Sequence, residues 1–252
     1  GEAGHGATRC RRARMKALLF AAGLGERMRP RADASPQRLL DVGGKPLVEW
    51  HLEKLAAIGI EDVVINTSWL ADQFPPALGS GERWGLRIRY SFEGTTPLET
   101  GGGMWNALPL LGDAHGSNEA FLLVNGDIWT DFDFARLPRE PDGLAHLVMV
   151  DRPAHATHGD FALDADDRVR ADGAHRLTYA GHGVYRPQLL DGWDQMVDAS
   201  YVADGKPKFQ LAPILRAHMG EGLIRGEHHR GRWTDVGTPG RLAQLDAELA
   251  DA

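Results

Sequence analysis

The chain has 252 residues, of which 42% are hydrophobic and 25% charged, so it can bury a sizeable core and has globular rather than disordered composition. Its net charge of −7, with cationic residues scattered along the chain, argues against a nucleic-acid partner. The single cysteine, Cys10, excludes an intramolecular disulfide and a cysteine-based zinc cluster and favours a reducing compartment, so we expect a cytoplasmic protein. No apolar run approaches the roughly 20 residues that cross a bilayer, and we therefore expect no membrane partner.

Residues 1–14 differ from the rest of the chain because they are rich in Gly, Ala and Arg. We expect them to form a disordered tail. No change of composition follows Met15, so residues 15–252 are predicted to form a single domain.

After Met15, short apolar runs alternate with helix-period segments, which is typical of βαβ units. The predicted strands are residues 16–22, 62–67, 86–91 at a sheet edge, 121–124, 144–150, 177–185 and 222–227, with a hairpin around 164–167. The predicted helices are residues 46–58, a helix opened by the glycines 101–103, and residues 239–250, which Thr238 would cap. This pattern predicts an α/β fold with a Rossmann-like, mixed and mostly parallel sheet flanked by helices.

A glycine-rich turn follows the first strand. Gly23 and Gly25 lack the Cβ atoms that would keep backbone N–H groups away from a phosphate. Arg27 follows where its guanidinium could clamp phosphate oxygens. A dinucleotide-binding turn would need a third glycine in place of Met28, so an NAD-dependent oxidoreductase is the weaker alternative.

The turn is the first of five motifs that resemble, in their order, those of the sugar-1-phosphate nucleotidyltransferases. The motifs are AAGLGER (21–27), GGKPL (43–47), LETGGG (98–103), LVNGD (123–127) and WTDVGTP (233–239). The short chain, the LETGGG motif and residues 124–129 are similar in particular to the N-acetylmuramate 1-phosphate uridylyltransferases of bacterial cell-wall recycling. Mannose- or glucose-1-phosphate nucleotidyltransferases are the alternatives within the family.

The resemblance implies the nucleotide-diphospho-sugar transferase fold, a nucleoside triphosphate and a sugar 1-phosphate as substrates, and a monomer or weak homodimer. It implies that residues 100–103 read uracil and ribose, and three glycines opening a helix would let a planar base approach the backbone. The implied nucleotide-binding residues are Ala22, Gly23, Gly25, Glu99, Thr100, Gly101, Gly102 and Asn125. The sugar-binding candidates are Asp160, Gly181 and Lys208, although Asp160 and Gly181 suit ordinary hairpins equally well.

Two carboxylates point to a metal cofactor. Asp127 follows a buried strand and Asp235 precedes a helix, so both should lie at the carboxyl edge of the sheet, where ligands bind. Such a pair suits Mg²⁺, which takes one or two carboxylates and leaves its other positions to phosphate and water. The structural alternative for Asp235 is a helix cap.

One position departs from the family pattern. Gln37 stands where these enzymes usually carry a lysine that neutralises phosphate charge during transfer, and Arg38 follows it. Neighbouring residues of an extended segment point to opposite faces, which argues against a simple exchange of roles. The catalytic candidates are thus Arg27, Gln37 and Arg38, and a non-catalytic nucleotide-sugar-binding protein is a further alternative.

Overall fold

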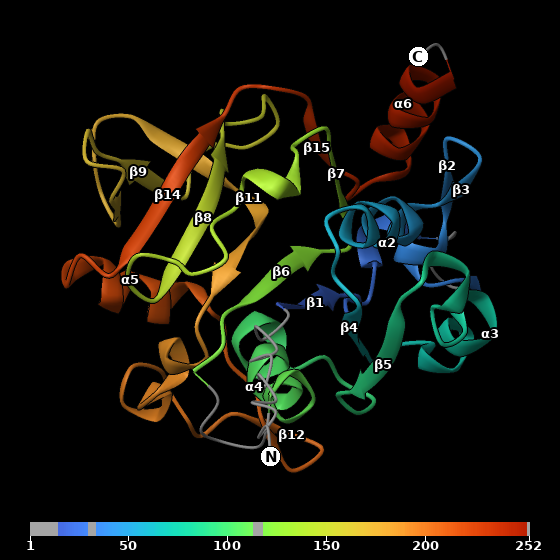
Figure 1. Ribbon diagram of the computed structural model, residues 1–252, viewed down its shortest axis with the longest axis horizontal. Coiled ribbons are helices and arrows are strands. Elements are labelled where there is room, and N and C mark those ends of the chain that lie inside the picture. Colours follow the sequence, from blue (N-terminus) through green and yellow to red (C-terminus); the bar gives the residue numbers. More distant parts are fainter. Residues whose placement is uncertain (1–14, 30–33, 113–117, 251–252) are drawn as a thin grey trace, which may run out of the picture.

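The computed structural model describes residues 15–29, 34–112 and 118–250, and the predicted tail at residues 1–14 lies outside the described residues. The main sheet consists of β1 (Lys16–Phe20), β4 (Asp62–Thr67), β5 (Arg87–Phe92), β6 (Phe121–Asn125), β8 (Ala145–Val150), β9 (Phe161–Leu163), β10 (Val169–Arg170), β11 (Arg176–Tyr185) and β14 (Ile224–His229). Three two-stranded ribbons accompany it: β2 (Asp41–Val42) with β3 (Lys45–Pro46), β7 (Ile128–Thr130) with β15 (Trp233–Asp235), and β12 (Val202–Ala203) with β13 (Lys206–Pro207). The α-helices are α2 (Leu47–Ala57), α3 (Phe74–Leu78), α4 (Glu99–Leu111), α5 (Ala212–Gly220) and α6 (Pro239–Ala250) (Figure 1).

The centre of the sheet is parallel. Strands β6, β1, β4 and β5 lie side by side in that order and run in one direction, and β5 forms the predicted edge. Strand β11 pairs antiparallel with β6 and β8, while β14 adds parallel to β8. The prediction of a mixed, mostly parallel sheet is therefore confirmed, and the predicted hairpin is the antiparallel pair of β9 and β10.

Helices cover both faces of the sheet (Figure 1). Ala17 and Leu19 of β1 belong to the core cluster that contains the buried face of α2. Leu18 and Phe20 point the other way, into the cluster that contains α4 and α5. Because successive strand residues face opposite sides, the continuous apolar run of β1 is what a strand buried on both faces requires.

The helix boundaries agree closely with the sequence patterns. Helix α2 begins directly after Pro46, whose φ of −52° leads into the first turn although the residue itself belongs to β3. Thr238 caps α6 as predicted, since its Oγ1 accepts a hydrogen bond of 3.3 Å from the backbone N–H of Arg241.

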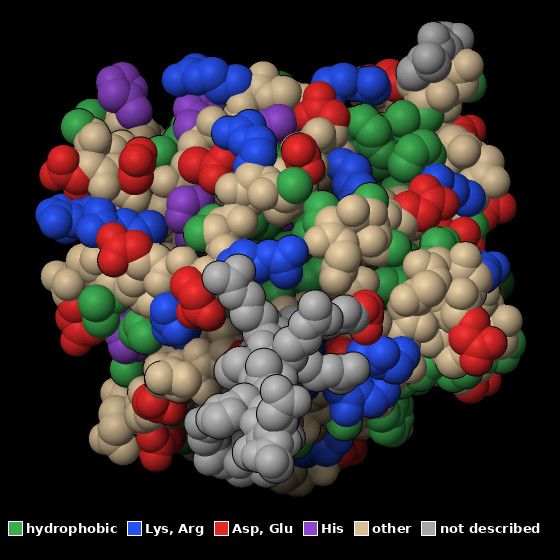
Figure 2. Space-filling model, in the orientation of Figure 1, with side chains coloured by type: hydrophobic (Ala, Val, Ile, Leu, Met, Phe, Trp, Pro, Cys, Tyr) green, Lys and Arg blue, Asp and Glu red, His purple; other side chains and the backbone are tan. Residues whose placement is uncertain are grey.

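The surface carries charged side chains of both signs, interspersed on the face shown in Figure 2. None of the helices in the described part of the chain could span a membrane.

The parallel strands determine where the site lies. Strands β1, β4, β5 and β6 all end at the same edge of the sheet, because they run in one direction. Their carboxyl ends lead into residues 21–25, Asn66, Glu93 and residues 125–127, respectively. Open α/β sheets bind ligands at this edge.

Candidate active site

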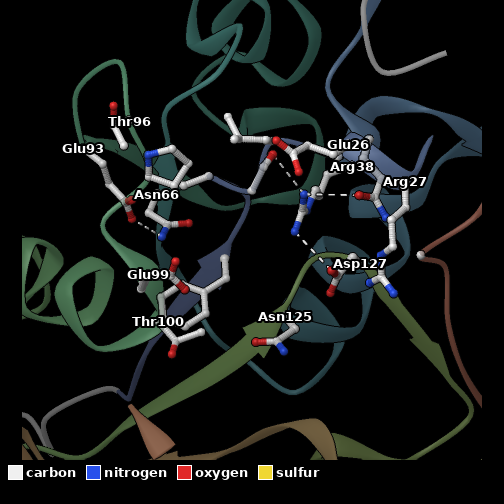
Figure 3. A pocket seen from close by; sticks show the side chains of 18 of the residues that line it. Glu26, Arg27, Arg38, Asn66, Glu93, Thr96, Glu99, Thr100, Asn125 and Asp127 are labelled. Carbon is white, nitrogen blue, oxygen red and sulfur yellow. Dashed lines mark hydrogen bonds and ion pairs between the residues drawn. The ribbon is translucent and has the colours of Figure 1, made fainter. Parts of the chain in front are cut away.

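A cavity of about 500 Å³ opens at the carboxyl edge of the parallel strands. Its walls come from the loops after β1, β4, β5 and β6, the start of α4, and the segment after β13 (Figure 3). The lining residues are Phe20, Ala22, Gly23, Leu24, Gly25, Glu26, Arg27, Gln37, Arg38, Asn66, Glu93, Thr96, Pro97, Glu99, Thr100, Asn125, Asp127, Lys208 and Gly237. Most of the residues that the sequence predicted for the site are therefore brought together.

One end of the cavity combines cations with the glycine-rich turn. Arg27, Arg38 and Asp127 lie at this end (Figure 3). The turn residues Gly23 and Gly25 also line the cavity, and the Gly23 backbone oxygen accepts a hydrogen bond from Arg38. Gly25 has φ 63°, a left-handed conformation that favours glycine and lets the turn lead into the 3₁₀ turn Glu26–Met28. Exposed backbone and guanidinium groups in one place can bind the oxygens of a polyphosphate.

Gln37 and Arg38 do not point to opposite faces, as an extended segment would require. Residues 37–39 form a 3₁₀ turn, and both side chains reach the cavity wall. The Gln37 side-chain amide donates a 2.5 Å hydrogen bond to the backbone oxygen of Val236. Arg38 donates to the Gly23 backbone oxygen and to Asp127 Oδ2, both at 3.2 Å. The cation at this point of the wall is therefore Arg38.

The other end is polar and acidic, and its residues Asn66 and Glu93 were not predicted. Asn66 Oδ1 accepts a hydrogen bond of 2.6 Å from the Ala21 N–H, and Asn66 Nδ2 donates one of 2.5 Å to Glu93 Oε1. Glu93 Oε2 accepts a third, of 2.7 Å, from the Leu98 N–H. This chain ties the glycine-rich turn to the loop before α4. Burial raises the pKa of Glu93 to about 7. Asn66 and Glu93 could have been identified from the sequence, because they lie at the carboxyl ends of the predicted strands β4 and β5.

Gly101 and Gly102, at the start of α4, pack against residues 207–210 and do not line the cavity. Helix α4 begins at Glu99, whose φ is 64°, and Glu99 and Thr100 line the cavity while Gly101 and Gly102 do not. A Cβ on Gly101 would lie 2.5 Å from the Phe209 ring, and one on Gly102 would lie 2.5 Å from the backbone oxygen of Pro207. Close packing against residues 207–210 requires glycine at both positions, and contact of Gly101 and Gly102 with the nucleotide stays a prediction.

One of the three sugar-binding candidates lines the cavity, and the other two do not. Lys208 lines the cavity, whereas Asp160 and Gly181 do not. Asp160 Oδ2 accepts a 2.8 Å hydrogen bond from the Tyr179 N–H, so it serves the hairpin. Gly181 has φ 80°, and a Cβ there would lie 2.9 Å from Asn125 Nδ2, so this glycine makes room for a residue that does line the cavity.

The two predicted metal ligands lie beside one antiparallel pair of strands: Asp127 directly precedes β7, and Asp235 is the last residue of β15. The Val236 N–H donates a 2.7 Å hydrogen bond to the backbone oxygen of Asp127, which aligns the segment after Asp127 with β15. Asp127 lines the cavity, and Asp235 precedes Gly237, which also lines it. Asp235 pairs through Oδ2 with Arg241 at 3.1 Å, and its Oδ1 lies 3.1 Å from His155 Nε2 without forming a hydrogen bond. The residues that the structure describes contain no group of three or more potential ligands that could hold a metal by themselves.

Comparisons with known proteins agree with this geometry. The profile of the Nucleotidyl transferase family matches residues 16–171. The chain is 45% identical over 240 residues to an N-acetylmuramate alpha-1-phosphate uridylyltransferase of Neisseria meningitidis, covering 92% of this chain and 97% of that protein. A protein of the same name from Caulobacter vibrioides is 32% identical over 252 residues, with 94% and 97% covered.

The fold is shared more widely. A mannose-1-phosphate guanylyltransferase of Mycobacterium tuberculosis is 30% identical over 244 residues, which are 92% of this chain and 64% of that protein. The crystal structure of a provisionally assigned glucose-1-phosphate thymidylyltransferase from Bacillus anthracis, in complex with sucrose, superposes with a TM-score of 0.76 at 17% identity, covering 94% and 96% of the two chains. The chain therefore belongs to the nucleotidyl transferase family of enzymes.

Proposed function

We propose that the protein transfers a uridylyl group from UTP to a sugar 1-phosphate, N-acetylmuramate 1-phosphate being the first choice, with release of pyrophosphate. The 45% identity to a uridylyltransferase over nearly both whole chains supports the substrate pair. Its place would be the cytoplasm, in the recycling of cell-wall sugars. The observation that carries the proposal is the cavity itself, which has cations and a glycine-rich turn at one end and the polar groups of Asn66, Glu93 and Thr100 at the other.

The two ends of the cavity match the two ends of a nucleoside triphosphate. Arg27, Arg38 and the amides of residues 23–25 would hold the phosphates, because fork-shaped guanidinium groups and exposed backbone N–H groups both bind phosphate oxygens. The nucleoside would then lie towards Glu99 and Thr100. Lys208, on the wall beside α4, is the candidate cation for the anionic sugar substrate.

A divalent metal fits the donor set. Asp127, just before β7, and Asp235, at the end of β15, both offer hard carboxylate oxygens, and Asp235 Oδ1 accepts no hydrogen bond from the described residues. Two carboxylates suit Mg²⁺, which leaves its remaining positions to phosphate and water. When bound there, the ion would neutralise charge on the α-phosphate.

The proposed reaction needs positioning and charge neutralisation, and it needs no general base. An oxygen of the sugar 1-phosphate, ionised at neutral pH, attacks the α-phosphorus of UTP. A new P–O bond forms, the bond to the β-phosphate oxygen breaks, and pyrophosphate leaves with the electron pair. Arg27 and Arg38 would stabilise the charge that develops on the departing pyrophosphate.

Gln37 motivates a second candidate function. Its side-chain amide donates to the Val236 backbone oxygen and carries no positive charge. A protein that binds nucleotide sugars without transferring a nucleotidyl group would not need a cation at this position. A transferase for mannose or glucose 1-phosphate is the alternative within the family, since the family also includes guanylyltransferases.

One experiment separates these possibilities. Pyrophosphate release should be measured with each of the four nucleoside triphosphates against N-acetylmuramate, mannose and glucose 1-phosphates. We expect the highest kcat/KM with UTP and N-acetylmuramate 1-phosphate. Release with another pair would identify a different transferase, and tight UTP binding without release under any combination would favour the binding protein.

A further inference from the structure

Arg38 occupies a place that two glycines make for it. Only 7% of the residue is exposed. A Cβ on Gly23 would lie 2.7 Å from Arg38 Nη1, and a Cβ on Gly126 would lie 2.9 Å from Arg38 Cγ. Any other residue at position 23 or 126 would thus press on this side chain. The stem of the side chain is therefore held by packing, with its guanidinium at the cavity wall.

The hydrogen bonds of this guanidinium are incomplete. Nη1 donates to Gly23 O and, at 3.5 Å, to Gln37 Oε1, and Nη2 donates to Asp127 Oδ2 (Figure 3). The buried Nε has no hydrogen-bond partner among the described residues. A guanidinium carries five N–H donors, and a buried donor without an acceptor costs stability. Because Arg38 lines the cavity, an anionic ligand there could accept the remaining bonds.

The carboxylate of Asp127 is already paired with Arg38, although it is a proposed metal ligand. Its Oδ2 is engaged by Arg38 at 3.2 Å, so a divalent cation that approaches this carboxylate is repelled by the guanidinium and competes with it. Displacement alone would leave a buried guanidinium without a counter-ion, which is strongly unfavourable. A triphosphate in the same cavity removes the obstacle, since its oxygens can take over Arg38.

We infer that Arg38 is an exchangeable counter-ion: its guanidinium neutralises Asp127 when no nucleotide is bound and turns to the phosphates when a nucleotide binds, which frees Asp127 for the divalent cation. This inference rests on the proposed function and deepens it. It has two consequences that oppose each other. Removing the Arg38 charge strengthens the binding of metal alone, and removing the Asp127 charge strengthens the binding of metal-free nucleotide.

Both consequences can be measured without turnover. Mn²⁺ binding in the absence of nucleotide is followed by electron paramagnetic resonance, and UTP binding in EDTA is followed by calorimetry. Arg38→Gln and Arg38→Met keep most of the stem beside Gly126 and lose the charge. We expect both to bind Mn²⁺ about 10-fold more tightly than the parent, the lower end of what one adjacent charge does to a carboxylate's affinity for a proton. Both should bind metal-free UTP more weakly. Asp127→Asn should do the reverse, with tighter metal-free UTP binding and weaker Mn²⁺ binding.

The control removes the same charge elsewhere. Arg170 Nε pairs with Asp164 Oδ2 at 2.8 Å in the hairpin of β9 and β10, and neither residue lines the cavity. Arg170→Gln should match the parent in both titrations. The exchange is overturned if folded Arg38→Gln and Arg38→Met bind Mn²⁺ no more tightly than the parent, or if Asp127→Asn gains no affinity for metal-free UTP. Pyrophosphate release by the parent is measured separately. The binding titrations therefore test the exchange of Arg38, and pyrophosphate release tests the proposed transferase activity.

Discussion

At the scale of single residues, the site has a positive charge although Gln37 replaces the usual lysine, because Arg38 supplies it. The Gln37 amide holds the Val236 backbone oxygen, and Arg38 stands between Gly23 and Asp127. Gln37→Lys should therefore change the single-turnover rate of transfer by less than about 5-fold, because a second cation adds little where one is already placed. Arg38→Met should lower that rate by roughly 100-fold or more. A rise of 10-fold or more in Gln37→Lys would mean that Arg38 leaves the phosphates unclamped.

The two carboxylates give a second prediction. Asp127→Asn and Asp235→Asn should each lower kcat by about two orders of magnitude or more, because each removes a charged ligand of the proposed metal. Asp62→Asn is a matched control. Asp62 accepts a hydrogen bond from Arg87 and lies at the amino end of β4, opposite the end that borders the cavity. Turnover near the parent value in either site variant would remove that residue from the metal site.

Glu93 predicts a pH dependence of stability. Burial raises its pKa from an ordinary value of 4.5 to about 7. Between these values the folded protein holds a proton that the unfolded chain has released, so the free energy of unfolding should fall as the pH rises from about 4.5 to 7. The Glu93 contribution is at most about 3 kcal/mol.

The Glu93 contribution can be isolated by substitution. Urea unfolding of the parent and of Glu93→Gln at several pH values between 4.5 and 7.5 gives the difference between the two slopes. The parent should lose more stability than the variant across this interval. Parallel slopes would show that Glu93 ionises in the folded protein as it does in the unfolded chain.

At the scale of elements, the start of α4 is built on close contact with residues 207–210. Gly102→Ala should lower the free energy of unfolding by about 1–3 kcal/mol, because its Cβ would lie 2.5 Å from the Pro207 backbone oxygen. Gly220→Ala, in α5, is the matched control: outside its own helix and chain neighbours, no atom of the described residues lies within 4 Å of the added Cβ, so stability should be unchanged or rise by up to about 1 kcal/mol. Equal stabilities for the two variants would contradict the packing role of Gly102.

At the scale of the whole molecule, ligand binding should stabilise the fold, because the cavity joins four strand ends, α4 and the segment after β13. UTP with Mg²⁺ at 100 times its Kd should add about 2.7 kcal/mol to the free energy of unfolding. Thermal unfolding with each nucleoside triphosphate at equal concentration measures this, and UTP should raise the Tm most. A larger rise with GTP would favour a guanylyltransferase.

The architecture and the main wall of the site could be predicted from the amino-acid sequence. Apolar runs such as residues 62–67 became parallel strands because burial on both faces demands that pattern, and parallel strands end at one edge. The glycine-rich turn, Asp127 and Asn125 follow those ends directly, so their meeting could be foreseen from chain order alone.

Only the tertiary structure decided which groups face the cavity. The 3₁₀ turn at residues 37–39 directs Gln37 to Val236 and Arg38 to Asp127, whereas periodicity suggested opposite faces. Gly102 turned out to serve contact with Pro207, which lies 105 positions away. Glu93 joined the site through Asn66 on a neighbouring strand. The physical reason is common to all three: the direction of a side chain near a turn depends on contacts between distant segments, and local patterns carry no information about them.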